Sequence, residues 1–205
     1  MTNLRFVCLG LLCAGVCYGA RTVVQEIAVT NGGPYGSWTS PEYCPPGQFA
    51  TGYSMKIEAS QFSGDDTAMN SMRLTCSDAN GHNINQVTSG QGPFGSWTNL
   101  ESCPAGKYLV AFVLQVEGPQ GSSDDTAANY ARFYCRDFVG TQGITEISHS
   151  PGQGVWGNYG NYSPTCPVNS AICGLTTKIE GDQGSGDDTT LNDVKFYCCS
   201  DLHGK

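Results

Sequence analysis

The chain has 205 residues, of which 39% are apolar and 14% are charged, and it contains 27 Gly, 10 Pro and 11 Cys. This length supports one or two domains with a hydrophobic core, which excludes a short peptide held together by disulfides alone. The formal net charge of -8 excludes the basic surface that nucleic acids and anionic membranes require, so we expect neither as a partner.

The N-terminus has the pattern of a secretory signal peptide. Arg5 precedes an apolar stretch, residues 6–16, and small residues follow, so we expect cleavage after Gly19 or Ala20. The stretch is too short to span a bilayer, so we expect a secreted, extracellular protein without membrane insertion. Removal of residues 1–19 takes away three cysteines and leaves eight, an even number that is typical of a disulfide framework.

The rest of the chain repeats one unit three times. A Cys-Pro pair begins at Cys44, Cys103 and Cys166, and a second cysteine follows each of these after 32 residues. Each Cys-Pro pair is preceded by a Gly-rich aromatic turn, at residues 33–38, 92–97 and 154–159. We therefore expect a single domain, residues 20–205, built from three repeats at about 22–81, 82–140 and 141–202.

Within a repeat the apolar residues follow the two-residue period of β-strands. Residues 108–116 form an apolar, β-branched and aromatic run, and shorter alternating runs end at Cys76, Cys135 and Cys198. Gly, Pro, Asn, Asp and Ser clusters separate these runs, and no long stretch has a helical period. A unit of this size cannot bury its apolar face alone, so we expect three sheets packed around one axis as a threefold-pseudosymmetric, all-β prism. A three-bladed propeller and a β-trefoil are the alternatives.

The cysteine spacing favours one set of disulfides among the 105 pairings open to eight cysteines. The equal separations favour three equivalent bridges and leave two cysteines of the third repeat for each other. Cys198 and Cys199 are neighbours in a strand, so their side chains can serve separate bridges. The expected pairs are Cys44–Cys76, Cys103–Cys135, Cys166–Cys198 and Cys173–Cys199.

Three acidic loops are candidates for ligand chemistry. Each repeat has a Glu, at Glu58, Glu117 or Glu180, followed by Asp-Asp-Thr and then Asn at constant intervals. The pairs are Asp65 with Asp66, Asp124 with Asp125, and Asp187 with Asp188. Paired carboxylates can act in glycoside chemistry or bind calcium. Three near-identical copies favour hydrogen-bonded turns instead, so we expect no catalytic residue, metal or cofactor.

The aromatic turns are the other candidate for ligand binding. Trp38, Trp97 and Trp156 can stack on sugar rings, or they can pack at the ends of the prism. The basic residues Arg73, Arg132 and Lys195 stand at equivalent places between the cysteines, where salt bridges or a solvated rim are expected.

The combined motifs resemble the vitelline membrane outer layer protein family. The resemblance rests on the threefold Gly-Pro-aromatic-Gly-x-Trp turn, the Cys-Pro pairs, the Gly-Asp-Asp-Thr loops and the terminal Phe-Tyr-Cys-Cys, and it covers residues 22–202. It implies a β-prism of three Greek-key sheets, similar in fold to jacalin-type lectins and an insecticidal toxin domain. The third repeat departs from the pattern, with Val155 in place of Pro and Tyr159 in place of Trp.

The resemblance implies a secreted structural and interaction protein of the outer layer of the egg's vitelline membrane, or of a related secretion. Its expected partners are other coat proteins and glycans. Two alternatives stay open: a lectin-like carbohydrate-binding module, and a weak glycosyl transferase or hydrolase that acts on amino-sugar oligomers.

Overall fold

The computed structural model describes residues 21–59, 67–118, 127–181 and 189–200, and all regular structure in these ranges is β-strand. The six long strands are β4 (Phe49–Ile57), β5 (Met69–Ser77), β9 (Lys107–Val116), β10 (Ala128–Asp137), β13 (Ala171–Ile179) and β14 (Leu191–Ser200). The shorter strands are β1 (Thr22–Ala28), β2 (Ser37–Trp38), β3 (Glu42–Tyr43), β6 (Asn85–Val87), β7 (Ser96–Trp97), β8 (Glu101–Ser102), β11 (Thr145–Ile147) and β12 (Asn158–Tyr159). The four strands expected from the apolar periodicity are confirmed.

The strands form three antiparallel sheets with a similar order of strands. The first sheet has the order β6-β5-β4 with β7 and β8 both on the far side of β4, and the second has the order β11-β10-β9-β12. The third has the order β1-β14-β13 with β2 and β3 beyond β13. In the first two sheets, three consecutive strands lie side by side and the chain then returns to the free edge of the first of them, which is a Greek key.

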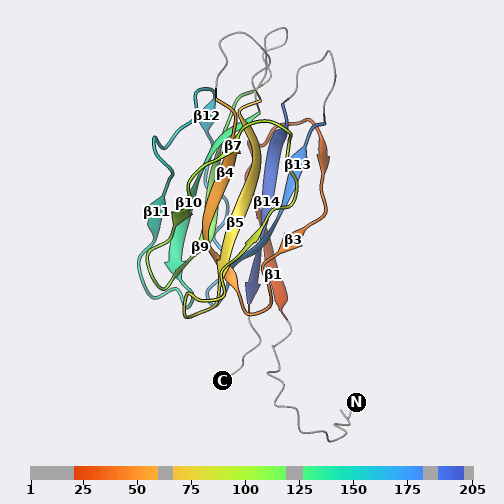
Figure 1. Cartoon of the computed structure of the whole chain (residues 1–205). Coiled ribbons are helices and arrows are strands. Elements are labelled where there is room, and N and C mark those ends of the chain that lie inside the picture. The colour runs from red at the N-terminus through yellow and green to blue at the C-terminus, as the bar shows by residue number, and fades with distance from the viewer. Residues whose placement is uncertain (1–20, 60–66, 119–126, 182–188, 201–205) are drawn as a thin grey trace, which may run out of the picture.

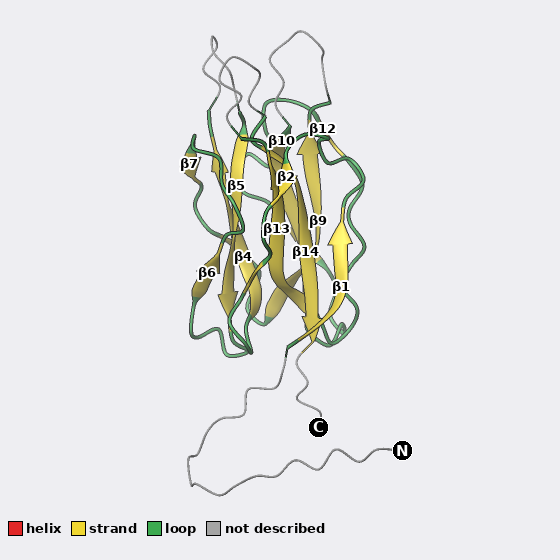
Figure 2. Ribbon diagram, turned by 90° about the vertical axis from the view of Figure 1, so that its right-hand side faces the viewer, coloured by secondary structure: helices red, strands yellow, loops and turns green. Residues whose placement is uncertain are grey.

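The three sheets enclose one axis and make a three-sided prism. The innermost strands β4, β9 and β13 contact one another in all three pairs, and the long strands run the length of the molecule (Figures 1 and 2). We call the end where β4, β9 and β13 finish the upper end, as it is drawn in Figure 1, and the opposite end the lower end. The predicted β-prism of three Greek-key sheets is confirmed, and neither the propeller nor the trefoil is formed.

Each sheet takes its strands from two repeats. The first sheet combines β4 and β5 with β6, β7 and β8, which come after residue 81. The third sheet is completed by the N-terminal strands β1, β2 and β3, which pair with the C-terminal strands β14 and β13 (Figure 2). Every repeat therefore contributes to two sides of the prism.

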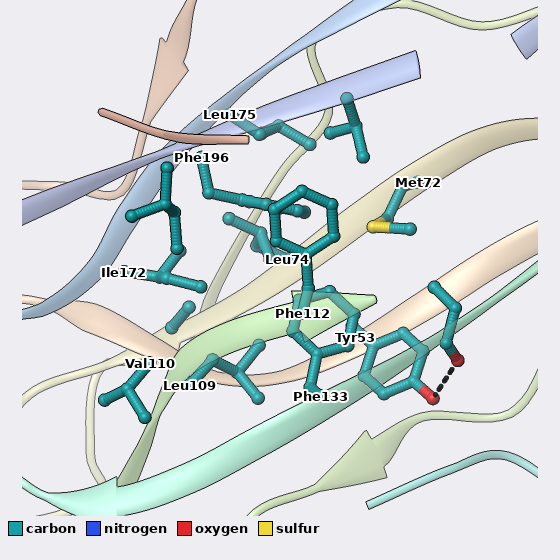
Figure 3. Close-up of a cluster of buried hydrophobic side chains, with 14 of the residues drawn as sticks. Tyr53, Met72, Leu74, Leu109, Val110, Phe112, Phe133, Ile172, Leu175 and Phe196 are labelled. Carbon is teal, nitrogen blue, oxygen red and sulfur yellow. Dashed lines mark hydrogen bonds between the residues drawn. The ribbon is translucent and has the colours of Figure 1, made fainter. Parts of the chain in front are cut away.

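Side chains from all three sheets fill the centre of the prism. Phe112 of β9 packs edge-on against Phe196 of β14, with ring centroids 4.7 Å apart. Phe133 of β10 lies 5.4 Å from Phe196 and 4.4 Å from Tyr53 of β4 (Figure 3). These four rings are fully buried. Because Tyr53 brings a hydroxyl into this core, it needs a partner, and it donates a hydrogen bond of 3.1 Å to the Ala131 carbonyl.

Three of the four disulfides join neighbouring sheets. Cys44 directly follows β3 of the third sheet and bonds Cys76 in β5 of the first sheet. In the same way, Cys103 follows β8 of the first sheet and bonds Cys135 in β10 of the second sheet. Cys166 lies beside β9 of the second sheet and bonds Cys198 in β14 of the third sheet. The fourth bridge, Cys173–Cys199, links β13 and β14 within the third sheet. The structure contains all four pairs favoured by the spacing, and three of them close the prism at its lower end.

Candidate binding groove

Two of the three tryptophans converge on one groove near the upper end of the prism. Trp97 belongs to β7 in the first sheet, and Trp156 lies in the segment that leads to β12 in the second sheet. Both line a groove of about 390 Å³ at the boundary between these two sheets. Trp38 lies on β2 in the third sheet, where it is 40% exposed and outside the groove. Of the three tryptophans that are candidates for ligand binding, the structure brings Trp97 and Trp156 together.

The lining of the groove is mostly apolar, with a few polar side chains that come from both sheets. Its residues are Ile57, Glu58, Ala59, Ala68, Ser96, Trp97, Thr98, Asn129, Tyr130, His149, Ser150, Pro151, Gln153, Gly154, Val155 and Trp156. None of these is a lysine or an arginine, so the described lining carries acidic charge from Glu58.

A segment that is two residues longer in the third repeat than in the second forms one wall of the groove. We call residues 148–156 the strap. Six residues lie between Ile147 and Gly154, whereas four lie between Val87 and Gly92 at the equivalent place in the second repeat. This added length lets the strap reach across toward the first sheet. The repeated motifs did not predict a site there.

The strap is held in place by both sheets. Arg132 of β10 donates two hydrogen bonds, 2.9 and 2.8 Å long, to the Gly152 carbonyl. On the other side, His149 Nδ1 lies 3.1 Å from Glu101 Oε1 of β8 in the first sheet. The His149 N–H also donates to the hydroxyl of Tyr53 at 3.1 Å. The wall of the groove is therefore fixed by the first sheet and by the second.

Tyr130 supports the strap from below and distinguishes this boundary from the other two. It is 3% exposed, and its hydroxyl donates to the His149 carbonyl at 3.0 Å. Burial raises the pKa of the Tyr130 hydroxyl. The residue that follows the repeated Asn is Ser71 in the first repeat and Asp193 in the third, so neither offers the same aromatic support.

The ring of Trp97 is held by a cation on the outer face of the sheet. The Arg73 guanidinium carbon lies 3.8 Å from the ring centroid, a stacking that fixes the ring plane. Trp97 lines the groove, whereas Arg73 is not among the described lining residues. Similar pairs recur on the other two sheets, where Arg132 stacks on Tyr159 and Lys195 on Trp38.

The repeated basic residues also meet acidic or amide partners on the outer strands. Arg132 Nη1 lies 3.5 Å from Glu146 Oε1 of β11, and Lys195 Nζ lies 2.9 Å from Glu26 Oε1 of β1. Arg73 instead donates to Gln86 of β6 at 3.3 Å. These contacts are partly exposed, so each contributes little to stability.

The Glu, Thr and Asn of the acidic loops form a structural hydrogen-bond chain. In the first repeat, Thr67 Oγ1 donates to Glu58 Oε2 at 2.7 Å, and Asn70 Nδ2 donates to Thr67 Oγ1 at 2.6 Å. Asn70 Oδ1 then accepts from the N–H of Phe94, at the aromatic turn of the next repeat. The third repeat has the same chain through Glu180, Thr189, Asn192 and Tyr35. The constant intervals of this motif thus have a structural cause.

The six aspartates predicted as candidate ligands lie outside the described residues. Among the residues that are described, no three His, Cys, Asp or Glu side chains gather as they would around a metal ion.

Sequence reasoning missed the side chains that anchor the aromatic turns. Lys56 donates to the Gly92 carbonyl at 2.8 Å, and Lys178 donates to the Pro34 carbonyl at 2.6 Å. In the second repeat Gln115 takes this role and donates to the Trp156 carbonyl at 2.7 Å. Each stands two residues before the repeated Glu, so the constant spacing of a Lys or Gln could have revealed them.

The repeated glycine of each aromatic turn has a steric reason. Gly36, Gly95 and Gly157 have φ values of 79°, 75° and 74°, which favour glycine. A Cβ at any of them would collide with the backbone of the long strand beneath, at Ile179, Ile57 and Val116 respectively.

A second hollow, of about 440 Å³, lies at the lower end beside Pro45 and Asn85. Its polar side chains are already engaged with one another. Asn85 Nδ2 donates to Gln48 Oε1 at 3.0 Å, and Asn83 Nδ2 donates to Asp78 Oδ2 at 2.8 Å. It has no aromatic lining residue, so the groove is the better candidate for binding.

Asp193, the counterpart of Tyr130 in the third repeat, is expected to make stability depend on pH. Burial raises the pKa of its carboxyl to about 6, although the Val194 N–H and the nearby Lys178 and Lys195 act to lower it. The folded state therefore holds a proton that the unfolded state releases, and stability falls as the pH rises from about 4 to about 6. Asp193→Asn should remove this loss, on the order of 1–2 kcal/mol after allowance for partial exposure. Urea unfolding at pH 4 and pH 7 measures it.

Asp78→Asn is the matched control for this pH dependence. Hydrogen bonds from the His82 N–H, the Asn83 side chain and the Asn80 N–H lower the pKa of Asp78. The stabilisation from the ionised Asp78 carboxyl is present above about pH 4 and is lost as the pH falls. The two substitutions should therefore change the pH dependence of the free energy of unfolding in opposite directions. If the free energy of unfolding changed equally with pH in the parent and in Asp193→Asn, the prediction would be contradicted.

The fold and the groove together define a disulfide-stapled β-prism protein with an aromatic groove between two of its sides. In the described ranges there is no helix long and apolar enough to cross a bilayer. The family described as "Vitelline membrane outer layer protein I (VOMI)" matches residues 25–201. The chain belongs to this family.

Two relatives support this assignment. The chain is 47% identical over 183 residues to "Vitelline membrane outer layer protein 1 homolog" from Homo sapiens, which covers 88% of this chain and 86% of the relative. It is 42% identical over 200 residues to the protein of the same name from Mus musculus, with 93% and 94% covered.

Solved structures of jacalin-related lectins show a more distant likeness. A mannose-specific lectin from Morus nigra in complex with mannose is 12% identical, with a TM-score of 0.47 and 92% of this chain and 99% of the lectin covered. A mannose-binding lectin from Ananas comosus is 12% identical, with a TM-score of 0.45 and coverage of 88% and 97%.

Proposed function

We propose that this protein is a secreted structural and interaction protein of an extracellular egg coat, the outer layer of the vitelline membrane or a related secretion. Family membership and the names of the two relatives are the observations that carry the proposal. The even cysteine count after residue 19 and the four disulfides support an oxidising, extracellular location.

The architecture suits a rigid building block of a coat. Three disulfides join each sheet to the next around the axis, and a shared aromatic core fills the space between them. Opening one sheet would require breaking covalent links and exposing buried rings, so local unfolding is suppressed. A coat protein that persists outside the cell needs this resistance.

Reassociation with stripped coats tests the proposal. Vitelline membranes from eggs of the source animal are extracted with high salt, and the oxidised protein without residues 1–19 is added back. We expect the protein to be found by mass spectrometry in the untreated coat and to sediment with the stripped coat. A reduced and alkylated sample of the same chain is the control. Absence from the coat, together with failure to sediment, would refute the structural role.

A carbohydrate-binding module is the second candidate. The observation that favours it is the convergence of Trp97 and Trp156 in one groove, since amphipathic aromatic rings stack on sugars. A glycan array on the oxidised protein tests it. Saturable binding that is lost in Trp156→Ala would support this function, and an array without hits would oppose it.

A further inference from the structure

We propose that the groove at Trp97 and Trp156 is a docking site for an extended, proline-rich segment of another protein, and that this segment carries lysine or arginine. The inference goes beyond the structural role, because it assigns one surface and one kind of partner. It rests on the shape of the groove, on which of its hydrogen-bonding groups are engaged, and on its charge.

The walls of the groove have the form that proline-rich ligands require. A polyproline II segment has three residues per turn and no internal hydrogen bonds, and it binds in channels between aromatic rings. Trp97 and Trp156 supply two such rings from different sheets, and Tyr130 and Pro151 complete an apolar floor and wall. Because the strap is bonded to both sheets, the groove is formed before any ligand arrives.

Three side-chain acceptors of the groove are already engaged. Asn129 Oδ1 accepts from the N–H of Trp156 at 3.2 Å, and Thr98 Oγ1 accepts from the N–H of Met55 at 3.0 Å. Glu58 Oε2 accepts from Thr67 Oγ1 at 2.7 Å. A sugar would present hydroxyls that each donate as well as accept. Their protons would compete with internal hydrogen bonds for these three acceptors.

The donors of the aromatic walls remain open. Within the described part of the chain, neither indole N–H, of Trp97 or of Trp156, has a hydrogen-bond partner. Proline has a carbonyl acceptor and no N–H donor, so a proline-rich segment offers acceptors without adding donors. The groove and such a segment are therefore complementary in hydrogen bonding.

Charge adds the second feature of the partner. Glu58 lines the groove, and the one basic side chain in the described lining, His149, is paired with Glu101. The whole chain has a net charge of -8. A proline-rich segment with Lys or Arg beside the prolines would meet an attractive field, and its association would weaken with salt.

Tryptophan fluorescence can report on this groove directly, because two of the three tryptophans line it. In a Trp38→Phe background, all tryptophan emission comes from the groove. We would titrate this protein, oxidised and without residues 1–19, with a peptide of four Pro-Pro-Lys triplets. A peptide of four Gly-Ser-Lys triplets has the same length and charge without the polyproline II preference, and it is the ligand control. Calorimetry of the parent and Trp38→Phe shows whether the background change is neutral.

The expected result is a saturable change in emission with the Pro-Pro-Lys peptide and at least about tenfold weaker binding of the Gly-Ser-Lys peptide. Trp156→Ala, measured by calorimetry, should weaken binding by about tenfold or more. Trp97→Phe and Trp156→Phe keep a ring but remove the indole N–H, so each should weaken binding roughly fivefold to tenfold. Trp38→Phe, at the equivalent turn of the third sheet, should bind as the parent does. If Trp156→Ala fails to fold, the affinity of Trp97→Phe and Trp156→Phe for the Pro-Pro-Lys peptide tests the proposal instead.

Three outcomes would overturn the proposal. The two peptides could bind equally well, which would show attraction by charge alone. The Pro-Pro-Lys peptide could fail to bind at millimolar concentration. A glycan could bind with an affinity that falls in the Trp97 and Trp156 variants while the peptide does not bind, which would assign the groove to a sugar. Coat reassociation of the parent is measured separately, so failure of the peptide with intact reassociation refutes this inference and leaves the structural role standing.

Discussion

Phe112→Ala is expected to lower the free energy of unfolding by about 3–5 kcal/mol, because it opens a cavity that the surrounding strands cannot close. Phe112 lies on β9 and contacts Phe196 of the third sheet and Phe133 of its own sheet, with centroid distances of 4.7 and 6.2 Å. It is fully buried. Removing its ring takes away contacts that hold two sides of the prism together. Guanidinium unfolding of the oxidised protein, followed by circular dichroism, measures the loss.

Phe94→Ala is the control for this core substitution. Phe94 belongs to an aromatic turn and is 42% exposed, so its truncation should change stability by less than about 1 kcal/mol. If Phe112→Ala and Phe94→Ala unfolded at the same denaturant concentration, the central aromatic cluster would not be the main packing contact between the sheets.

Replacing both Cys103 and Cys135 by Ala is expected to lower the free energy of unfolding by about 3–4 kcal/mol. The bridge closes a loop of 32 residues, and the chain-entropy model assigns a stabilisation of about this size to such a loop. The same bridge is the covalent link between β8 of the first sheet and β10 of the second. Differential scanning calorimetry of the variant and the parent measures the shift in Tm.

Thr51→Ala with Ser77→Ala controls for the loss of two side chains across a strand pair. These residues occupy, in the first repeat, the place that the fourth bridge has in the third repeat, and a 3.4 Å hydrogen bond joins their hydroxyls. We expect a loss of about 1 kcal/mol or less from this pair. A cysteine variant with the melting curve of the parent would show that the bridge does not form or does not stabilise the fold.

Most of the fold could be predicted from the sequence, because its signals are local and occur three times. The two-residue period located the strands that end at Cys76, Cys135 and Cys198, and equal cysteine separations gave the disulfide pairs present in the structure. The exchange of strands between repeats could not be predicted. Sequence periodicity located β5 but did not say whether its outer neighbour would come from its own repeat or, as β6 does, from the next one.

The candidate site was predicted only in part. Trp97 and Trp156 were candidates because aromatic side chains can stack on ligands. The sequence around Trp38 gave no sign that this residue would lie apart on another sheet. The groove depends on the added length of the strap and on Tyr130 beneath it, and both are exceptions to the repeat. Val155 and Tyr159 were the departures noted in the sequence of the third repeat, whereas the length of the strap and Tyr130 were not recognised as features of a site.

The third sheet has a consequence for biosynthesis. Its outer strand β1 pairs with β14 from Thr22 opposite Ser200 to Ala28 opposite Lys195, so it joins the two ends of the described chain. A ribosome releases the N-terminal strands first, and they must wait without their partners while some 170 residues are made. The first and second sheets can assemble in that interval, since their strands are contiguous in the sequence. The nascent chain therefore carries an unpaired strand edge until β14 has been made, and the pairing of β1 with β14 then completes the third sheet.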